Sequence, residues 1–223
     1  MLRDVGLIAN KDLRAELRSR VALNQIVPFA LLILVLFGFA LDADSTTLAT
    51  FTPGLYWVAI VLSALLAVHR SVELEAGDGA SDALLLTGVT PVAVFLGKAL
   101  ALLAELWLLA FFLLGGVLVL YQPPVADLPL LIATILVAVI GIAAAGTLYG
   151  ALISGQRARE TVLPILLLPV LAPVVIGASR AFADAMATVA TNGWAWLALL
   201  GAFGGSYLVI GSYSYGLVLE DFS

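Results

Sequence analysis

Six long stretches of this sequence contain no Asp, Glu, Lys, Arg or His, and this feature constrains the fold more than any other. They are residues 21–41, 45–68, 106–126, 128–156, 161–179 and 185–219. A helix needs roughly 20 apolar residues to cross a hydrocarbon core of about 30 Å, so each stretch is long enough for a membrane span. The chain is 63% hydrophobic and only 11% charged, whereas a soluble domain carries about 25% charged residues. A soluble single-domain enzyme is therefore excluded.

The stretches predict helices and not a membrane barrel, because they are continuous and rich in Leu and Ala instead of alternating. The third span is expected to begin before its uncharged stretch, near Val92. We predict an all-α membrane protein with one transmembrane domain over residues 1–223. The expected spans lie near 21–41, 51–69, 92–120, 128–153, 161–179 and 194–219. So little chain remains outside them that a catalytic domain does not fit.

Residues 1–20 predict an amphipathic helix that lies along the membrane surface before the first span. Its apolar stripe is Leu2, Val5, Ala9, Leu13 and Leu17, and its opposite stripe is Arg3, Lys11, Arg14 and Arg18. Leu7 and Ile8 depart from this pattern. Basic helices with one apolar face bind at the membrane interface. The alternative is a charged tail that is merely solvated.

The basic residues are distributed unequally between the two sides of the expected membrane. Nine of the ten fall on one side: Arg3, Lys11, Arg14, Arg18, Arg20, Arg70, Lys98, Arg157 and Arg159. Arg180 is the tenth. Since Lys and Arg concentrate in cytoplasmic loops, we expect both termini and residues 69–91 to face the cytoplasm.

Composition excludes several kinds of chemistry. The chain has no cysteine, which excludes disulfides, thiolate metal sites and iron–sulfur clusters. Its net charge of −5 offers no basic surface to nucleic acid. It has no G-x-x-x-x-G-K-[ST] motif to bind nucleotide phosphates, so a partner would have to hydrolyse any ATP that is used. We interpret His69, the single histidine, as an interfacial residue beside Arg70, with heme ligation as the alternative.

The long segment between the second and third spans is a candidate docking site. It is acidic at first and leucine-rich later, and Gly77-Asp78-Gly79 predicts a turn before a short helix capped by Ser81 or Asp78. Loops longer than about 12–15 residues are often functional, so we expect a docking element, with an ordinary connecting loop as the alternative. The candidate residues are Glu73, Glu75, Asp78, Gly79, Asp82, Leu84, Leu85 and Leu86.

Lys98 and Glu105 are ionisable residues inside the third expected span. They lie seven residues apart, on roughly one face of a helix. Ionisable groups within a membrane indicate a proton or substrate pathway, so the two form a candidate intramembrane polar site. The alternative is that Lys98 reaches the membrane surface and Glu105 reaches a polar cavity or a neighbouring subunit.

Two glycine pairs predict places where helices approach closely. They are Gly146-x-x-x-Gly150 and Gly201-x-x-x-Gly205. Small residues four apart let helix backbones come together in a membrane. We expect packing within one subunit, with a dimer seam as the alternative.

Aromatic and charged residues near the span ends predict surface positions. Tyr56 and Trp57 begin the second span, so we expect them to anchor the chain at the lipid interface. Arg180 and Asp184 are four residues apart and are expected to pair on a short surface helix.

Three stretches of the chain resemble the CcmB family, heme exporter protein B. The first is Lys11-Asp-Leu-Arg-Ala-Glu-Leu-Arg-Ser-Arg20, with Leu23-Asn24 and Phe29-Ala-Leu-Leu. The second is Phe51-Thr-Pro-Gly-Leu-Tyr-Trp-Val-Ala59. The third combines Asp78-Gly79, Leu84-Leu85-Leu86 and Gly97-Lys98-Ala99. This third pattern is shared with ABC-2 exporter permeases in general.

The resemblance implies an ABC-2-like permease with an N-terminal interfacial helix and six transmembrane helices, which is a transport subunit and not an enzyme. It also implies a homodimer in the bacterial inner membrane, bound to a cytoplasmic ABC ATPase. A heme-handling membrane protein and a periplasmic heme chaperone would be further partners. Residues 78–87 would then form a coupling helix on the ATPase. No cofactor is expected on this subunit: ATP would bind the partner, and heme would be the cargo unless ATP drives release of the heme-loaded chaperone.

Two other functions fit the same spans. The first is the permease of another ABC-2 exporter, moving a lipid, a glycan or a drug. The second is a stand-alone secondary transporter. Such a transporter is expected to show several intramembrane charges and paired broken helices. This chain offers Glu105 and a proline-rich fifth span.

Overall fold

A computed structural model describes residues 1–19, 22–41, 45–78, 89–153, 159–189 and 192–220. Every regular element in these ranges is helical, as expected. The elements are α1 (Leu2–Ser19), η1 (Ala22–Ile26, a π-helix), α2 (Val27–Ala40), α3 (Ser45–Asp78), α5 (Pro91–Leu120), α6 (Leu128–Ile153), α7 (Arg159–Ala185) and α8 (Gly193–Glu220).

Five helices in the described ranges are long and apolar enough to cross a membrane. The qualifying segments are Thr47–Glu73, Pro91–Leu120, Leu128–Ile153, Thr161–Ala185 and Gly193–Leu217. The N-terminal part differs from these, because Leu2–Ser19 and Asn24–Ala40 form a pair bent by 54°.

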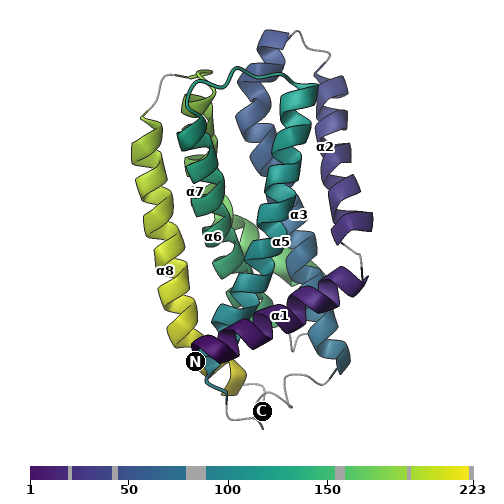
Figure 1. Ribbon diagram of the computed structural model, residues 1–223, viewed down its shortest axis with the longest axis vertical. Helices are drawn as coiled ribbons and strands as arrows, with labels where there is room; N and C mark the ends of the chain where they lie inside the picture. The colour runs from purple at the N-terminus through teal and green to yellow at the C-terminus, as the bar shows by residue number, and fades with distance from the viewer. Residues whose placement is uncertain (20–21, 42–44, 79–88, 154–158, 190–191, 221–223) are drawn as a thin grey trace.

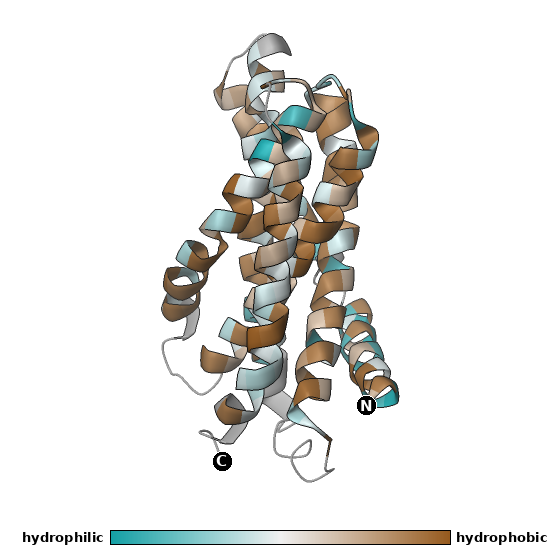
Figure 2. Cartoon of the chain, turned by 90° about the vertical axis from the view of Figure 1, so that its left-hand side faces the viewer, coloured by the Kyte–Doolittle hydropathy of each residue, from teal (hydrophilic) through white to brown (hydrophobic). Residues whose placement is uncertain are grey.

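The long helices stand side by side in one bundle, and α1 lies obliquely across its lower part in Figure 1. α6 is central and contacts α3, α5, α7 and α8, whereas α2 packs at one side against α3 and α5. α1 packs on α5. Figure 2 shows hydrophobic residues along most of the bundle and a mixture of hydrophilic and hydrophobic residues on α1. We call the end that holds α1 and the C-terminal turn of α8 the α1 end.

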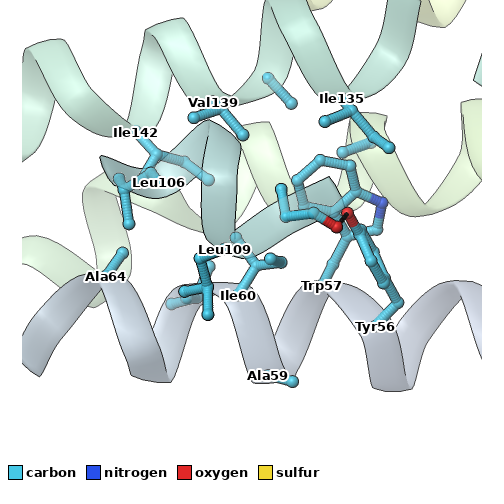
Figure 3. Packing of buried hydrophobic residues seen from close by; sticks show 14 of the residues in the cluster. Tyr56, Trp57, Ala59, Ile60, Ala64, Leu106, Leu109, Ile135, Val139 and Ile142 are labelled. Atoms are coloured by element: carbon cyan, nitrogen blue, oxygen red, sulfur yellow. Dashed lines mark hydrogen bonds between the residues drawn. The ribbon is translucent and has the colours of Figure 1, made fainter. Parts of the chain in front are cut away.

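The middle of the bundle is filled by aliphatic side chains from three helices. Figure 3 shows Ile60 of α3, Leu106 and Leu109 of α5, and Ile135 and Ile142 of α6 between these three helices. All five are buried. Since apolar lipid provides little hydrophobic drive between helices, such close packing is a principal source of their association.

A cluster of aromatic rings packs inside the bundle toward the end opposite α1, and we call this end the aromatic end. Tyr56 stacks on Phe182 with ring centroids 4.7 Å apart, and Trp57 meets the same ring edge-on at 5.4 Å. The Tyr56 hydroxyl donates a hydrogen bond of 2.8 Å to the Ala110 carbonyl. The expected lipid-interface position of Tyr56 and Trp57 is wrong, because both are fully buried. Since α3 begins at Ser45, Tyr56 lies about three helical turns inside it.

Backbone hydrogen bonds and helix caps hold the loops of the aromatic end. The amides of Ala126 and Asp127 both donate to the Ala185 carbonyl at the end of α7. An Asp127 carboxylate oxygen accepts from the Leu130 amide, and Asp184 accepts from the Gly193 amide, each at 3.0 Å. These contacts satisfy amides at the starts of α6 and α8, which would otherwise lack partners.

Two helices continue where the sequence analysis predicts a break. α3 remains helical through Asp78, so the turn expected at Gly77-Asp78 is wrong at these two residues. The Glu-Leu-Glu-Ala run before them has high helix propensity, which outweighs the cost of one glycine. α7 continues to Ala185, so Arg180 and Asp184 lie in a long helix and not on a short surface one.

The two glycine pairs behave differently. A Cβ atom placed on Gly146 would lie 2.7 Å from Cγ2 of Val68, and one on Gly150 would lie 3.2 Å from Cγ1 of the same residue. This pair therefore lets α3 pack closely on α6, as expected. Gly201 and Gly205 have no heavy atom within 4 Å of the corresponding position among the described residues.

Candidate functional site

Four helices place polar side chains around one small cavity at the α1 end. Lys98 lies near the start of α5, Ser71 near the end of α3, Thr147 near the end of α6 and Tyr215 near the end of α8. The cavity measures about 20 Å³. A polar cavity of this size has room for about one water molecule.

The lysine of this cavity is almost completely enclosed. Lys98 is 8% exposed, although ammonium groups are rarely buried without polar partners. Ser71, Thr147 and Tyr215, each of which carries a hydroxyl group, belong to the same lining. Because the cavity lies between four helices, movement of any one of them would change the surroundings of Lys98.

Small residues and one aromatic pair bring these helices together. Gly146 and Gly150 line the cavity and admit Val68 of α3 close to α6. Phe95 of α5 packs on Tyr215 with ring centroids 5.5 Å apart. The position of the lysine therefore depends on close contacts among α3, α5, α6 and α8.

Glu105 lies deeper along α5 and is half-buried. It is within electrostatic range of the Glu16 carboxyl on α1. It does not belong to the described lining of the Lys98 cavity. The two ionisable residues of α5 thus have different surroundings. Lys98 lines a cavity together with residues of α3, α6 and α8, whereas Glu105 interacts electrostatically with a residue of α1.

The last turns of α3 carry the charged groups of the expected docking segment. Glu73 is partly exposed and lies 3.4 Å from His69 Nε2 and 3.6 Å from Arg70 Nη1. Glu75 and Asp78 follow within α3. Five further candidates lie outside the described residues: Gly79, Asp82, Leu84, Leu85 and Leu86.

The sequence analysis identified Lys98 but not the hydroxyl residues around it. Ser71, Thr147 and Tyr215 are separated by tens of residues and look ordinary in the sequence. The one feature that could have identified them is a polar side chain close to the end of an apolar helix. Their convergence results from how four helices pack, which periodicity along one helix does not reveal.

Comparison with known proteins gives a consistent result along the chain. The family model described as CcmB protein matches residues 4–220. Heme exporter protein B of Haemophilus influenzae is 29% identical over 204 residues, covering 87% of this chain and 87% of that protein. The Pseudomonas aeruginosa protein of the same name is 28% identical over 206 residues, covering 88% and 89%. The Paracoccus denitrificans one is 29% identical over 180 residues, covering 77% and 78%.

Proposed function

This chain belongs to the CcmB family, and we propose that it is the membrane permease subunit of an ABC transporter for cytochrome c biogenesis. The observation that carries this proposal is the family match over residues 4–220. The names of the relatives indicate heme export. In one form of the proposal the cargo is heme; in the other, ATP hydrolysis releases the heme-loaded chaperone.

In the proposed assembly, two copies of this chain bind a cytoplasmic ABC ATPase in the bacterial inner membrane. A heme-handling membrane protein and a periplasmic heme chaperone complete it. The chain itself binds no cofactor in this proposal: ATP binds the ATPase, because the sequence has no phosphate-binding glycine loop. Its role is transport and not catalysis.

The proposed topology has six spans, with both termini in the cytoplasm. η1 and α2, of 5 and 14 residues, supply the first crossing, since about 17–25 residues span the hydrocarbon core. α1 lies along the cytoplasmic surface and turns into this crossing at the 54° bend. The concentration of Lys and Arg on one side supports this orientation.

Coupling to the ATPase is assigned to the segment that follows the span of α3. Glu73, Glu75 and Asp78 lie on the last turns of α3, which end on the proposed cytoplasmic side in this topology. Gly79 and Asp82, followed by Leu84, Leu85 and Leu86, would supply the docking surface itself. In this proposal the leucines fill an apolar groove of the ATPase and the acidic residues determine how it approaches.

In this proposal, ATPase binding at the docking segment affects the membrane helices at the Lys98 cavity. Lys98 lies on the first turns of α5, directly after the docking segment, and its cavity joins four helices. A displacement of the docking segment would change the helix packing around the lysine. Glu105, on the same helix, is the second polar residue of the proposed intramembrane site.

The experiment that tests this function is deletion of the gene, with c-type cytochromes scored by heme staining. We expect holo-cytochromes c to disappear while b-type cytochromes and total heme remain. Normal c-type cytochromes would overturn the proposal in favour of another ABC-2 exporter. Isolation of the tagged chain from membranes tests the other alternative, a stand-alone secondary transporter, because such a transporter would purify without any ATPase subunit.

A further inference from the structure

The side chains of α1 divide into three faces. Val5 and Ile8 are buried against α5, where a Cβ atom on Gly97 would lie 2.7 Å from Cβ of Ile8. A second face carries exposed apolar residues, with Leu2 88% and Leu17 67% exposed. Val5, a member of the predicted apolar stripe, and Ile8, which departs from that stripe, therefore both pack on the bundle.

The third face of α1 lines a groove and carries positive charge. The groove's described lining consists of Leu7, Asn10, Lys11, Arg14, Ala15, Arg18 and Ser19, and its volume is about 600 Å³. We call it the cationic groove. Lys11, Arg14 and Arg18 are spaced by three and four residues, which places them in one row along the helix. Three of the ten basic residues of a chain with net charge −5 thus line one groove.

Within the described part of α1, an ion pair joins an acid to a basic residue of the groove. Lys11 lies 3.0 Å from an Asp12 carboxylate oxygen. Asp4 lies 2.8 Å from the amino group of Met1, and Glu16 is on the side of Glu105. None of these acids belongs to the described lining of the groove.

The groove has the chemistry of an amphiphile's binding site. Its volume falls within the range of about 300–1,000 Å³ typical of small-molecule sites. It combines three cations with Leu7, an apolar side chain that is 58% exposed. A basic helix whose apolar face enters the membrane holds its charges at the depth of the lipid headgroups.

We propose that the cationic groove binds the phosphate of an anionic phospholipid, such as phosphatidylglycerol, through Lys11, Arg14 and Arg18. Leu7 contacts the lipid's glycerol and upper acyl region. The inference rests on the placement of α1 at the cytoplasmic surface proposed above. Since α1 packs over Gly97, which directly precedes Lys98, an occupied groove holds α1 against the start of α5.

The test measures lipid retained by the purified full-length chain. Native mass spectrometry of the protein in detergent is performed with phosphatidylglycerol or phosphatidylcholine added. We expect the wild-type chain to retain phosphatidylglycerol selectively, and Lys11→Gln/Arg14→Gln/Arg18→Gln to bind it roughly a hundredfold more weakly, since each basic residue near the surface contributes about fivefold. The charge-conserving variant Lys11→Arg/Arg14→Lys/Arg18→Lys should retain it.

Ala15→Trp distinguishes binding in the groove from diffuse electrostatic attraction, because it adds a bulky side chain to the groove lining without changing charge. We expect it to lose the selective lipid as well. Retention by Ala15→Trp, or by the triple Gln variant, would overturn the proposal. Full displacement by excess inorganic phosphate would also overturn it, in favour of a soluble phosphate ligand.

Size-exclusion chromatography and thermal unfolding identify variants that do not fold. If the triple Gln variant aggregates, the charge-conserving variant and Ala15→Trp decide the outcome. The assay needs neither the ATPase nor heme, so its result is independent of the cytochrome phenotype. Loss of ATPase co-purification in the triple Gln variant, with lipid binding unchanged, would assign the groove to a protein contact and overturn the lipid assignment.

Discussion

The two ends of the bundle are built from different chemistry. At the aromatic end, Tyr56, Trp57 and Phe182 are fully buried against one another, and side-chain caps satisfy the adjoining helix starts. At the α1 end, Lys98 lines a small cavity with Ser71, Thr147 and Tyr215, and glycines let the helices approach closely. Large interlocking rings resist sliding, whereas small residues and hydroxyls can exchange partners over short displacements.

This difference indicates where an external ATPase could act on the bundle. We expect the aromatic end to remain closed while the α1 end adapts to its partner. The comparison makes separate predictions for the two ends, and those for Phe182, Gly97 and Tyr121 each have a matched control in a residue of the same type.

The largest effect is expected from Phe182→Ala at the aromatic end. This substitution removes the ring on which Tyr56 and Trp57 both pack, so the free energy of unfolding should fall by about 3 kcal/mol. That is the lower end of the range for Phe-to-Ala cavities, because lipid and not water surrounds the unfolded helices. Phe112→Ala is the control, since Phe112 is 51% exposed, and it should change stability by less than about 0.5 kcal/mol.

Unfolding of both variants is followed in mixed micelles of increasing SDS content. Equal effects of Phe182→Ala and Phe112→Ala would show that the aromatic end is no more tightly packed than the lipid-facing surface. The comparison between the two ends would then fail.

Gly97→Ala should weaken the packing of α1 on α5 by about 1–3 kcal/mol, which is the usual cost of overpacking. The added Cβ would lie 3.1 Å from the Val5 carbonyl oxygen as well as 2.7 Å from Ile8, so the helix itself must move. The natural chain has no cysteine, so Ile8→Cys gives a single maleimide site. Labelling there should accelerate in the Gly97→Ala background.

Gly115→Ala controls for the loss of a glycine from the same helix, because nothing described lies within 4 Å of its Cβ position. It should leave the labelling rate unchanged. Slow labelling in both the Gly97→Ala and the Gly115→Ala backgrounds would contradict this prediction. It would mean that α1 stays packed on α5 despite the added methyl group at Gly97.

Tyr121→Phe is expected to have a smaller effect at the aromatic end. The Tyr121 hydroxyl donates to the Leu34 carbonyl, which ties α2 to the end of α5. Removing it should lower stability by about 1–2 kcal/mol, because the buried carbonyl loses a partner. Tyr213 is 82% exposed, so Tyr213→Phe should leave the same SDS unfolding midpoint in place. Equal SDS unfolding midpoints for the two variants would show that the Tyr121–Leu34 hydrogen bond does not contribute to stability.

His69→Ala should have the smallest effect. Its 3.4 Å contact with Glu73 is partly exposed, and such pairs contribute a few tenths of a kcal/mol. Heme staining should show nearly normal c-type cytochromes. Their loss, with insertion and ATPase binding intact, would instead restore heme ligation as the role of this residue.

Hydropathy predicted the helical class well, and α5 and α6 begin and end within one residue of the expected spans. It placed Tyr56 and Trp57 wrongly, because a ring near the start of an apolar stretch fits a lipid interface and an aromatic cluster equally well. Phe182, which decides between them, lies more than a hundred residues away. The end of α3 was misplaced for a local reason: strong helix formers preceding Gly77 extended the helix into the expected turn.

The candidate site was predictable only in part. Lys98 and Glu105 stood out because charges are rare in apolar stretches. Their separation into two environments was not visible in the sequence. It depends on how α1 lies along α5, with Ile8 at Gly97 and Glu16 in electrostatic range of Glu105, while α3, α6 and α8 line the cavity at Lys98. The leucines assigned to ATPase docking remain a prediction from sequence.

Co-purification of the ATPase with Leu85→Asp tests the central claim most directly. The tagged chain is isolated at fixed low salt from membranes that carry its natural partners, beside Leu85→Met, which keeps an apolar side chain. The account predicts that Leu85→Asp loses the ATPase, because a buried unpaired charge and a lost anchor together cost more than about 2 kcal/mol. Leu85→Met should retain the ATPase, and both variants should insert at wild-type yield. Stoichiometric ATPase on Leu85→Asp would contradict the proposed coupling segment.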